Sequence, residues 1–115
     1  MSRVYVAKDP KRRNRATGEW ERAIDLTPAR KFGELVFLLP DGSRPALSQR
    51  LVDELRHGLK DYSDNDYLLP VGDPALIALT AAIAARTNGG RLRLLCWDRL
   101  LRCYLASDVL AWGQA

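Results

Sequence analysis

Four cations lie within five residues, at Lys11, Arg12, Arg13 and Arg15. Clustered Lys and Arg side chains neutralise phosphates, and they give nucleic-acid binding that depends on salt and little on base sequence. Residues 8–21 show neither a helical nor a strand period, so a mobile or partner-ordered loop is predicted there, with Trp20 expected to pack in the core. The alternatives are a solvated loop and an arm that packs on the acidic turn at residues 61–66.

Two loops are expected at the carboxyl ends of parallel strands, where α/β sheets bind their ligands. One contains Asp41, Ser43 and Arg44, and the other contains Gly72 and Asp73. Each loop precedes a helix, so its backbone N–H groups could hold a phosphate or a nucleotide. Neither loop has the glycine spacing of a dinucleotide fingerprint or of a P-loop. The simpler interpretation is that Asp73 caps a helix and that Asp41 belongs to a turn.

The same two carboxylates could converge on a divalent metal, a pattern loosely similar to the acidic strand ends of NYN and PIN family nucleases. The second acid that usually follows Gly-Asp in those nucleases is replaced here by Pro74 and Ala75. We therefore assign no catalytic residue, no metal ligand and no cofactor from the sequence.

A third group of residues lies in a predicted C-terminal hairpin, whose strands cover residues 91–97 and 102–106. A turn centred between Arg99 and Leu100 would set Trp97 opposite Arg102, and Cys96 opposite Cys103. The cysteines are expected to be buried free thiols, although this register leaves a bridge open. A surface for stacking bases or for contacting a partner protein is predicted from four residues of the hairpin, Trp97, Arg99, Arg102 and Tyr104.

The segments that must position these residues alternate between strand and helix patterns. Residues 3–6 suit a strand at a sheet edge, and residues 34–39 form an apolar run typical of a central strand buried on both faces. Leu47, Leu51, Leu55 and Leu59 recur every four residues, which predicts an amphipathic helix with this stripe facing the core. Residues 67–71 repeat the strand signal. The alanine-rich segment 75–86 predicts a helix whose nearly unbroken apolar surface favours burial by a second subunit, that is, a homodimer.

Two strand-helix-strand crossovers follow from this order, and crossovers of this kind are right-handed by default. The predicted fold is a small Rossmann-like α/β sandwich of two or three layers, in which a mixed sheet has a parallel core and an antiparallel C-terminal hairpin. Residues 1–31 are interpreted as an N-terminal edge strand and basic arm, and residues 32–115 as a single α/β domain.

Composition narrows the class of protein further. A chain of 115 residues with 47% apolar and 28% charged residues is typical of one ordinary domain. Residues 1–31 hold nine basic and four acidic side chains, whereas the other 84 residues have a net charge of −1. The basic character therefore belongs to the arm. The sequence shows neither a membrane span nor the apolar core of a secretory signal, so a cytoplasmic location is expected.

The stretch from Asp66 to Tyr104, together with residues 32–42, resembles small uncharacterised proteins of phages and prophages. The segments that carry this likeness are Asp-Tyr-Leu-Leu, Val-Gly-Asp-Pro, Ala-Ala-Ile-Ala-Ala and Leu-Arg-Leu-Leu-Cys-Trp-Asp-Arg. The resemblance covers about two thirds of the chain and omits the basic arm. It implies a cytoplasmic setting in an infected or lysogenic bacterium, and it carries no catalytic residues.

Two hypotheses about function follow. The first is a non-enzymatic accessory protein that binds a macromolecule, either nucleic acid through the basic arm or a host protein that it occludes. The second is a nucleotide- or phosphate-binding protein, or a metal-dependent nuclease, that works at the loops of Asp41 and Asp73.

Overall fold

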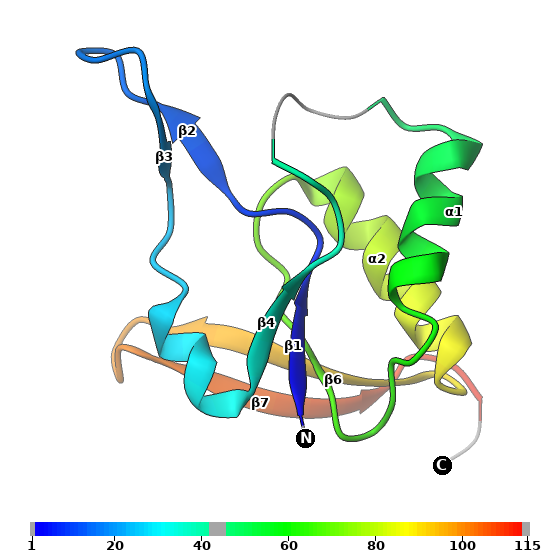
Figure 1. Cartoon of the computed structure of the whole chain (residues 1–115). Coiled ribbons are helices and arrows are strands. Elements are labelled where there is room, and N and C mark those ends of the chain that lie inside the picture. The colour runs from blue at the N-terminus through cyan, green and yellow to red at the C-terminus, as the bar shows by residue number, and fades with distance from the viewer. Residues whose placement is uncertain (1, 42–45, 114–115) are drawn as a thin grey trace.

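Strands and helices alternate along most of the chain in the computed structural model, which describes residues 2–41 and 46–113. The elements in chain order are β1 (Arg3–Val6), β2 (Lys11–Arg13), β3 (Trp20–Arg22), the 3₁₀ helix η1 (Thr27–Phe32), β4 (Glu34–Phe37), α1 (Gln49–Gly58), β5 (Tyr67–Leu68), α2 (Pro74–Thr87), β6 (Arg91–Asp98) and β7 (Cys103–Leu110). Figure 1 shows β2 and β3 projecting from the rest of the molecule as a separate ribbon.

Five strands form one sheet in the order β4-β1-β5-β6-β7, and β2 pairs with β3 alone. β1 runs parallel to β4 and to β5, β5 runs parallel to β6, and β7 is antiparallel to β6. The predicted α/β class, with a parallel core and an antiparallel C-terminal hairpin, is confirmed. Counted along the chain within this sheet, the order is 2-1-3-4-5, one of the two common orders of doubly wound sheets.

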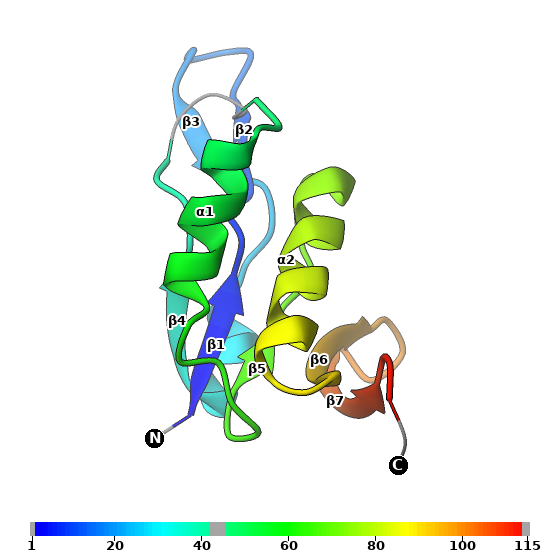
Figure 2. The same ribbon diagram turned by 90° about the vertical axis from the view of Figure 1, so that its right-hand side faces the viewer.

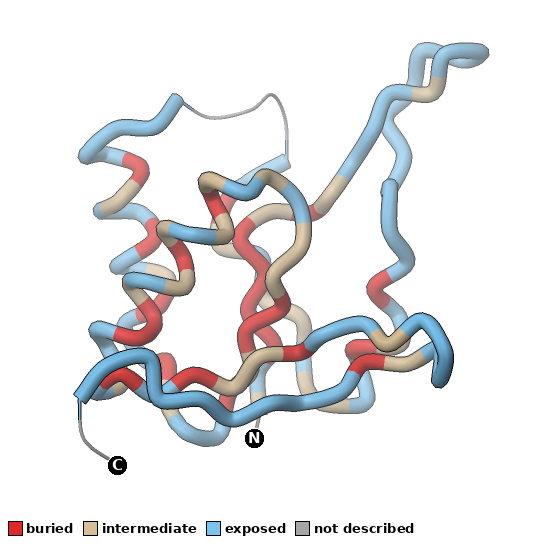
Figure 3. The backbone as a smooth tube through the Cα atoms, turned by 180° about the vertical axis from the view of Figure 1, so that it is seen from behind, coloured by how far each residue is buried: buried red, intermediate tan, exposed pale blue. Residues whose placement is uncertain are grey.

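The predicted places of the first two sheet strands are wrong. β1 lies inside the sheet, not at its edge, and Val4, Tyr5 and Val6 are almost completely buried. β4, expected in the centre, is the outer strand, and its Phe37 is 37% exposed. Figure 3 shows β1 as a buried strand in the middle of the molecule. Removal of residues 1–31 would therefore take away an interior strand of the sheet together with the ribbon.

The place of β1 depends on a contact that is distant in sequence. The Asp66 carboxylate accepts a hydrogen bond from the backbone N–H of Arg3 at 3.0 Å, and it also accepts from the backbone N–H of Ser63 at 3.0 Å. Asp66 is only 4% exposed, so this carboxylate ties the start of β1 to the turn that leads into β5. The acidic turn thus has a structural role of its own.

The sheet separates two layers. Helices α1 and α2 cover one face, and η1 lies on the other, as Figures 1 and 2 show. Alternate side chains of β1 point to opposite faces of the sheet. Val4 and Val6 pack in the hydrophobic cluster beside η1, whereas Tyr5 packs in the cluster beneath the helices. The connection from β1 to β4 crosses the sheet in the opposite direction from the two connections that contain α1 and α2. Right-handed connections therefore require η1 to lie on the face opposite the two helices.

Helix α1 begins at Gln49, because the Ser48 hydroxyl accepts a hydrogen bond from the Leu51 N–H and caps the helix. Leu51, Leu55 and Leu59 are buried as predicted. Leu47 is not part of this stripe: it precedes the cap, so it does not follow the helical period, and its side chain is 59% exposed.

Helix α2 packs against α1 and β6 of its own chain, and Ala84 and Ala85 are buried there. The small alanine side chains let the helix lie close to the sheet. Within residues 2–41 and 46–113, neither helix is long and apolar enough to cross a membrane.

Candidate nucleic-acid interface

The basic segment forms a two-stranded antiparallel ribbon, in which Lys11, Arg12 and Arg13 lie opposite Arg22, Glu21 and Trp20. The prediction of an irregular loop for residues 8–21 is therefore wrong. A six-residue connection, residues 14–19, closes the ribbon: the Asn14 side chain accepts from the N–H groups of Ala16 and Thr17, and Gly18 adopts a φ of 75°. Every residue of β2 and β3 is exposed, so no apolar alternation marks these strands in the sequence.

Strand geometry sorts the ribbon side chains onto two faces. Because facing residues share a side, Lys11 and Arg22 lie on the same face as Arg13 and Trp20. Both positions of the pair Arg12 and Glu21 lie on the other face, where their side chains are 3.4 Å apart. One face of the ribbon therefore presents three cations and an indole, and we call it the cationic face.

The base of the ribbon is held by two ion pairs. Arg22 donates two hydrogen bonds to the Asp9 carboxylate, at 2.8 and 2.7 Å, and Asp9 is only 8% exposed. The bond to this carboxylate raises the pKa of Arg22. Lys11 donates to Asp41 at 2.5 Å and so connects the ribbon to the loop after β4. These contacts position the ribbon and use part of its charge.

The cations nearer the tip are held less firmly. Arg13 donates to the backbone oxygen of Gly18 at 3.3 Å, a contact that leaves its charge uncompensated, and Arg15 lies exposed in the connection. Trp20, expected in the core, is 62% exposed beside Arg13. Its exposure follows from its place on a ribbon in which every strand residue is exposed.

The two strand-end loops have structural partners of their own. Asp73 accepts from the Ala75 N–H at 2.9 Å and caps α2, as the simpler interpretation predicted. Asp41 accepts from Lys11, and Gly72 takes the φ of 102° that the turn before the cap requires. Ser43 and Arg44 lie outside the described residues. Within those residues, no three His, Cys, Asp or Glu side chains gather where they could hold a metal ion.

An open groove of about 520 Å³ lies beside these loops, between residues 7–11 at the end of β1 and residues 71–74 after β5. The direction of the chain across the sheet reverses between β1 and β5, and doubly wound sheets place their ligands at this switch point. Lys8, Lys11 and Asp9 line the groove, so it carries charges of both signs.

The hairpin residues do not face one another as predicted. Trp97 lies opposite Tyr104, and the turn spans residues 99–102, with Arg102 in it at a φ of 52°. The turn is centred one residue later than expected, so Cys96 faces Leu105 and Cys103 faces Asp98. Both cysteines are free thiols, but neither is buried as expected, because Cys96 is exposed and Cys103 is half-buried.

Trp97 and Tyr104 meet edge to face, with ring centroids 5.0 Å apart. Trp97 is 46% exposed, whereas Tyr104 is buried beneath it, and this burial raises the pKa of Tyr104. Both rings line an apolar cavity of about 590 Å³ together with Ile24, Pro28 and Leu95. Arg99 and Arg102 are exposed in the turn. Of the four residues predicted to form a contact surface, Trp97, Arg99 and Arg102 are therefore exposed to solvent, whereas Tyr104 is not.

Comparison with known families identifies a relationship that covers these features. A model of the phage Pam3 gp32-like protein family matches residues 2–110. The chain belongs to this family. The expectation of a phage protein is confirmed by the match, and the Pam3 gp32-like region includes the ribbon as well as the sheet. No curated protein and no solved structure matches the chain significantly.

The contact that anchors the ribbon of this Pam3 gp32-like protein is hard to predict from the sequence. Asp9 and Arg22 stand thirteen residues apart with opposite charges, and only the pairing of β2 with β3 brings them together. The Asn14 to Gly18 connection was the one available signal, because Asn favours turns and Gly supplies the positive φ.

Replacing Arg22 with Ala is expected to lower the free energy of unfolding by about 1–3 kcal/mol, because it leaves the buried Asp9 carboxylate without its two donors. Arg12→Ala is the matched control on the same ribbon. Its partner Glu21 is exposed, so this change is expected to cost less than about 1 kcal/mol. Urea unfolding of both variants measures the difference, and equal costs would contradict the anchoring role of Arg22.

Proposed function

We propose that this protein binds nucleic acid through the cationic face of the β2–β3 ribbon. The observation that carries the proposal is the segregation of the ribbon. Arg13 shares a face with the exposed indole of Trp20, and the paired carboxylate Glu21 lies on the other face. Lys11 and Arg22 lie on the same face as Arg13, although each is already paired with a carboxylate at the base of the ribbon. Phosphate oxygens would be neutralised by the cations. A base could stack on Trp20, since aromatic side chains on such surfaces accept any base.

The shape of the element adds support. A two-stranded ribbon is narrow enough to enter the major groove of a duplex, and it can equally lie along a single strand. Figure 1 shows the ribbon extending away from the sheet and the helices, so a nucleic acid could reach both of its sides. In this proposal the protein is an accessory factor that acts by occupying or recruiting nucleic acid, with no chemical step.

The test is a titration of the intact protein against labelled single- and double-stranded DNA and RNA, at about 50 and 200 mM salt. Binding that weakens roughly tenfold or more over this range, with little dependence on sequence, is expected if the ribbon neutralises two or more phosphates. Affinity that is absent for all four probes, or that does not change with salt, would overturn the proposal.

The same titration with Mg²⁺ separates the alternative function. Cleavage of a probe that needs Mg²⁺ and disappears in Asp73→Asn would support a metal-dependent nuclease at the strand-end loops. Asp73 caps α2 and Asp41 pairs with Lys11, so each carboxylate already has a structural partner, and binding without cleavage is the expected result.

A host protein is the second kind of partner to consider, and the exposure of Trp97 favours it at the hairpin surface. Trp and Arg are enriched among the residues that dominate protein interfaces. This candidate becomes the leading one if the four nucleic-acid probes fail to bind.

A further inference from the structure

Strand β7 forms an open edge of the main sheet. It runs for eight residues, from Cys103 to Leu110, and pairs with β6 on one side only. Its segment contains no proline, lysine or arginine, and Asp108 is its single charged residue. Natural proteins protect exposed sheet edges with lysines, prolines, bulges or short strands, because an unprotected edge pairs with other chains. None of these devices is present in β7.

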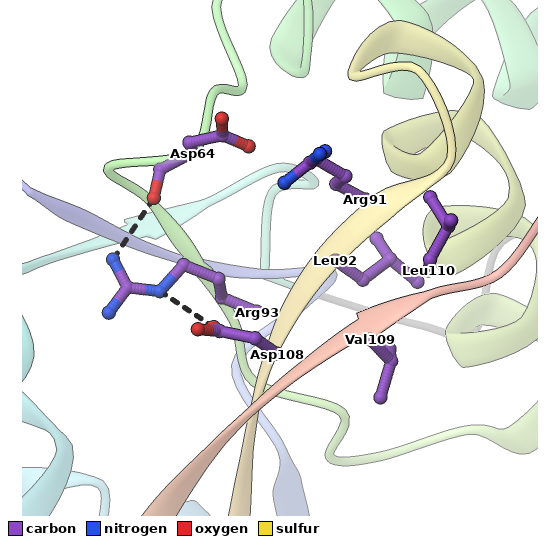
Figure 4. Close-up of a pocket in the computed structure, with 7 residues that line it drawn as sticks. All are labelled: Asp64, Arg91, Leu92, Arg93, Asp108, Val109 and Leu110. Carbon is purple, nitrogen blue, oxygen red and sulfur yellow. Dashed lines mark hydrogen bonds and ion pairs between the residues drawn. The ribbon is translucent and has the colours of Figure 1, made fainter. Parts of the chain in front are cut away.

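The single charge of the edge is compensated inside the chain. The Arg93 guanidinium donates to the Asp108 carboxylate at 3.0 Å, and it also donates to the backbone oxygen of Asp64 at 3.0 Å (Figure 4). A further hydrogen bond reaches the Tyr67 hydroxyl at 2.8 Å, and the guanidinium carbon lies 4.2 Å from the centre of that ring. Arg93 is therefore held in place, and β7 presents an edge that is close to neutral.

Exposed apolar side chains are concentrated in the β6–β7 hairpin and the residues after it, and three of them lie on β7 itself: Leu105, Val109 and Leu110. Eleven large apolar residues are exposed in the described parts of the chain, and seven of them lie between residues 97 and 112: Trp97, Leu100, Leu101, Leu105, Val109, Leu110 and Trp112. β7 is exposed from Leu105 to Leu110, whereas Tyr104 is buried, and Figure 3 shows most of this strand as exposed. Such a concentration marks an interaction surface more often than a solvated one.

We propose that β7 pairs with β7 of a second copy of this chain, antiparallel across a two-fold axis that passes through Ser107. In this register Leu105 lies opposite the partner's Val109, and Ala106 lies opposite the partner's Asp108. Tyr104 lies opposite the partner's Leu110. The five-stranded sheets of the two subunits then form one continuous sheet of ten strands.

Charge and side-chain matching select this register. A two-fold axis perpendicular to the sheet pairs residues that point to the same face, so the axis must pass through a residue and not between two. An axis through Asp108 would set two carboxylates opposite each other, which is unfavourable. An axis through Ala106 would put Leu105 opposite a serine. Only the axis through Ser107 pairs Leu105 with Val109 twice while separating the two aspartates.

The edge also explains why a second copy is a better occupant than a strand of unrelated sequence. Leu105 and Val109 are both about 43% exposed on the face of the sheet that carries the helices, beyond the part that α2 covers. Pairing covers both residues in each subunit with the same two residues of the other, as an isologous interface requires. The dimer interface is therefore β7 and not the alanine-rich helix α2.

Ser107→Lys tests this interface, with Ala82→Lys on the exposed side of α2 as the matched control. Ser107 and Ala82 are both exposed, so neither change introduces a charge into the core. Two lysines opposite each other at the two-fold axis are expected to raise the dimer dissociation constant at least about tenfold. Sedimentation equilibrium should show a dimer for the unchanged protein and for Ala82→Lys, and a monomer for Ser107→Lys at the same concentration.

Three results would overturn the proposal. The first is an unchanged protein that stays monomeric up to about 100 μM, a concentration at which a specific contact of micromolar affinity would be saturated. The second is a dimer that survives Ser107→Lys. The third is a dimer that only Ala82→Lys disrupts. The last result would place the interface on α2, as the sequence suggested.

A cysteine at the axis tests the register itself. In a background of Cys96→Ser and Cys103→Ser, oxidation should link two chains of Ser107→Cys, because the two thiols would lie opposite each other. Asp108→Cys is the control, since this register sets residue 108 opposite Ala106. Stronger linking of Asp108→Cys than of Ser107→Cys would contradict the proposed register.

Discussion

Replacing Arg13 and Arg15 together with Ala is expected to lower the affinity for nucleic acid about tenfold at 50 mM salt. Each cation that neutralises a phosphate contributes roughly 0.7 to 0.9 to the slope of log affinity against log salt, so the slope should fall by about 1.4 to 1.8. Titrations of the double variant at four salt concentrations give both quantities. The effect is large because the carbonyl contact of Arg13 leaves its charge uncompensated and Arg15 is exposed in the connection.

The control for this prediction is a double variant of equal charge, Arg56→Ala with Arg86→Ala. These residues lie in the last turns of α1 and α2, at the end of the molecule away from the ribbon (Figure 1). Because the interaction is screened over about 10 Å at 0.1 M salt, the control is expected to bind nearly as well as the unchanged protein. Equal losses in the two double variants would mean that net charge, not the ribbon, sets the affinity.

Lys11 and Arg12 belong to the same predicted cluster, but in the structure they are less available to bind phosphate than Arg13 and Arg15. Lys11 is paired with Asp41, and Arg12 lies 3.4 Å from a Glu21 oxygen on the opposite face of the ribbon. A phosphate would have to compete with a carboxylate at each of these positions. The four cations are equivalent in the sequence and become different only through their partners in the fold.

The same distinction explains which parts of the fold the sequence predicts. Periodic apolar residues such as Leu51 and Leu55 determine helix α1 locally, and Asp73 followed by Pro74 marks the start of α2. The order of strands in the sheet depends instead on contacts between distant residues. Val4 and Val6 suit a strand, but only the pairing with β4 and β5 and the bond from Arg3 to Asp66 place that strand inside the sheet.

The charge cluster of the candidate interface could be predicted from the sequence, but the pairing of β2 with β3 could not. The cluster at residues 11–15 is visible in the sequence, yet a ribbon exposed on both faces shows no apolar period. The hairpin turn was misplaced by one residue because Arg102, which is not a glycine, adopts a positive φ there. Such a conformation is uncommon for this residue type, so turn chemistry gave no signal for it.

Leu55→Ala is expected to lower the free energy of unfolding by about 2–5 kcal/mol, the usual cost of emptying a buried leucine site. Leu55 is completely buried in the cluster that joins α1 to Leu76 of α2 and to Ala7 after β1. Loss of its side chain opens a cavity in the cluster that joins these segments. Urea unfolding monitored by circular dichroism measures the change.

Leu47→Ala is the control that separates structure from sequence pattern. Leu47 and Leu55 occupy equivalent positions in the four-residue repeat, so a helix that began before Leu47 would make both substitutions costly. Because Ser48 caps the helix after Leu47 and leaves that side chain exposed, its replacement is expected to change stability by no more than about 0.5 kcal/mol. A loss at Leu47 comparable to that at Leu55 would show that the helix extends toward the N-terminus and that the cap at Ser48 does not form.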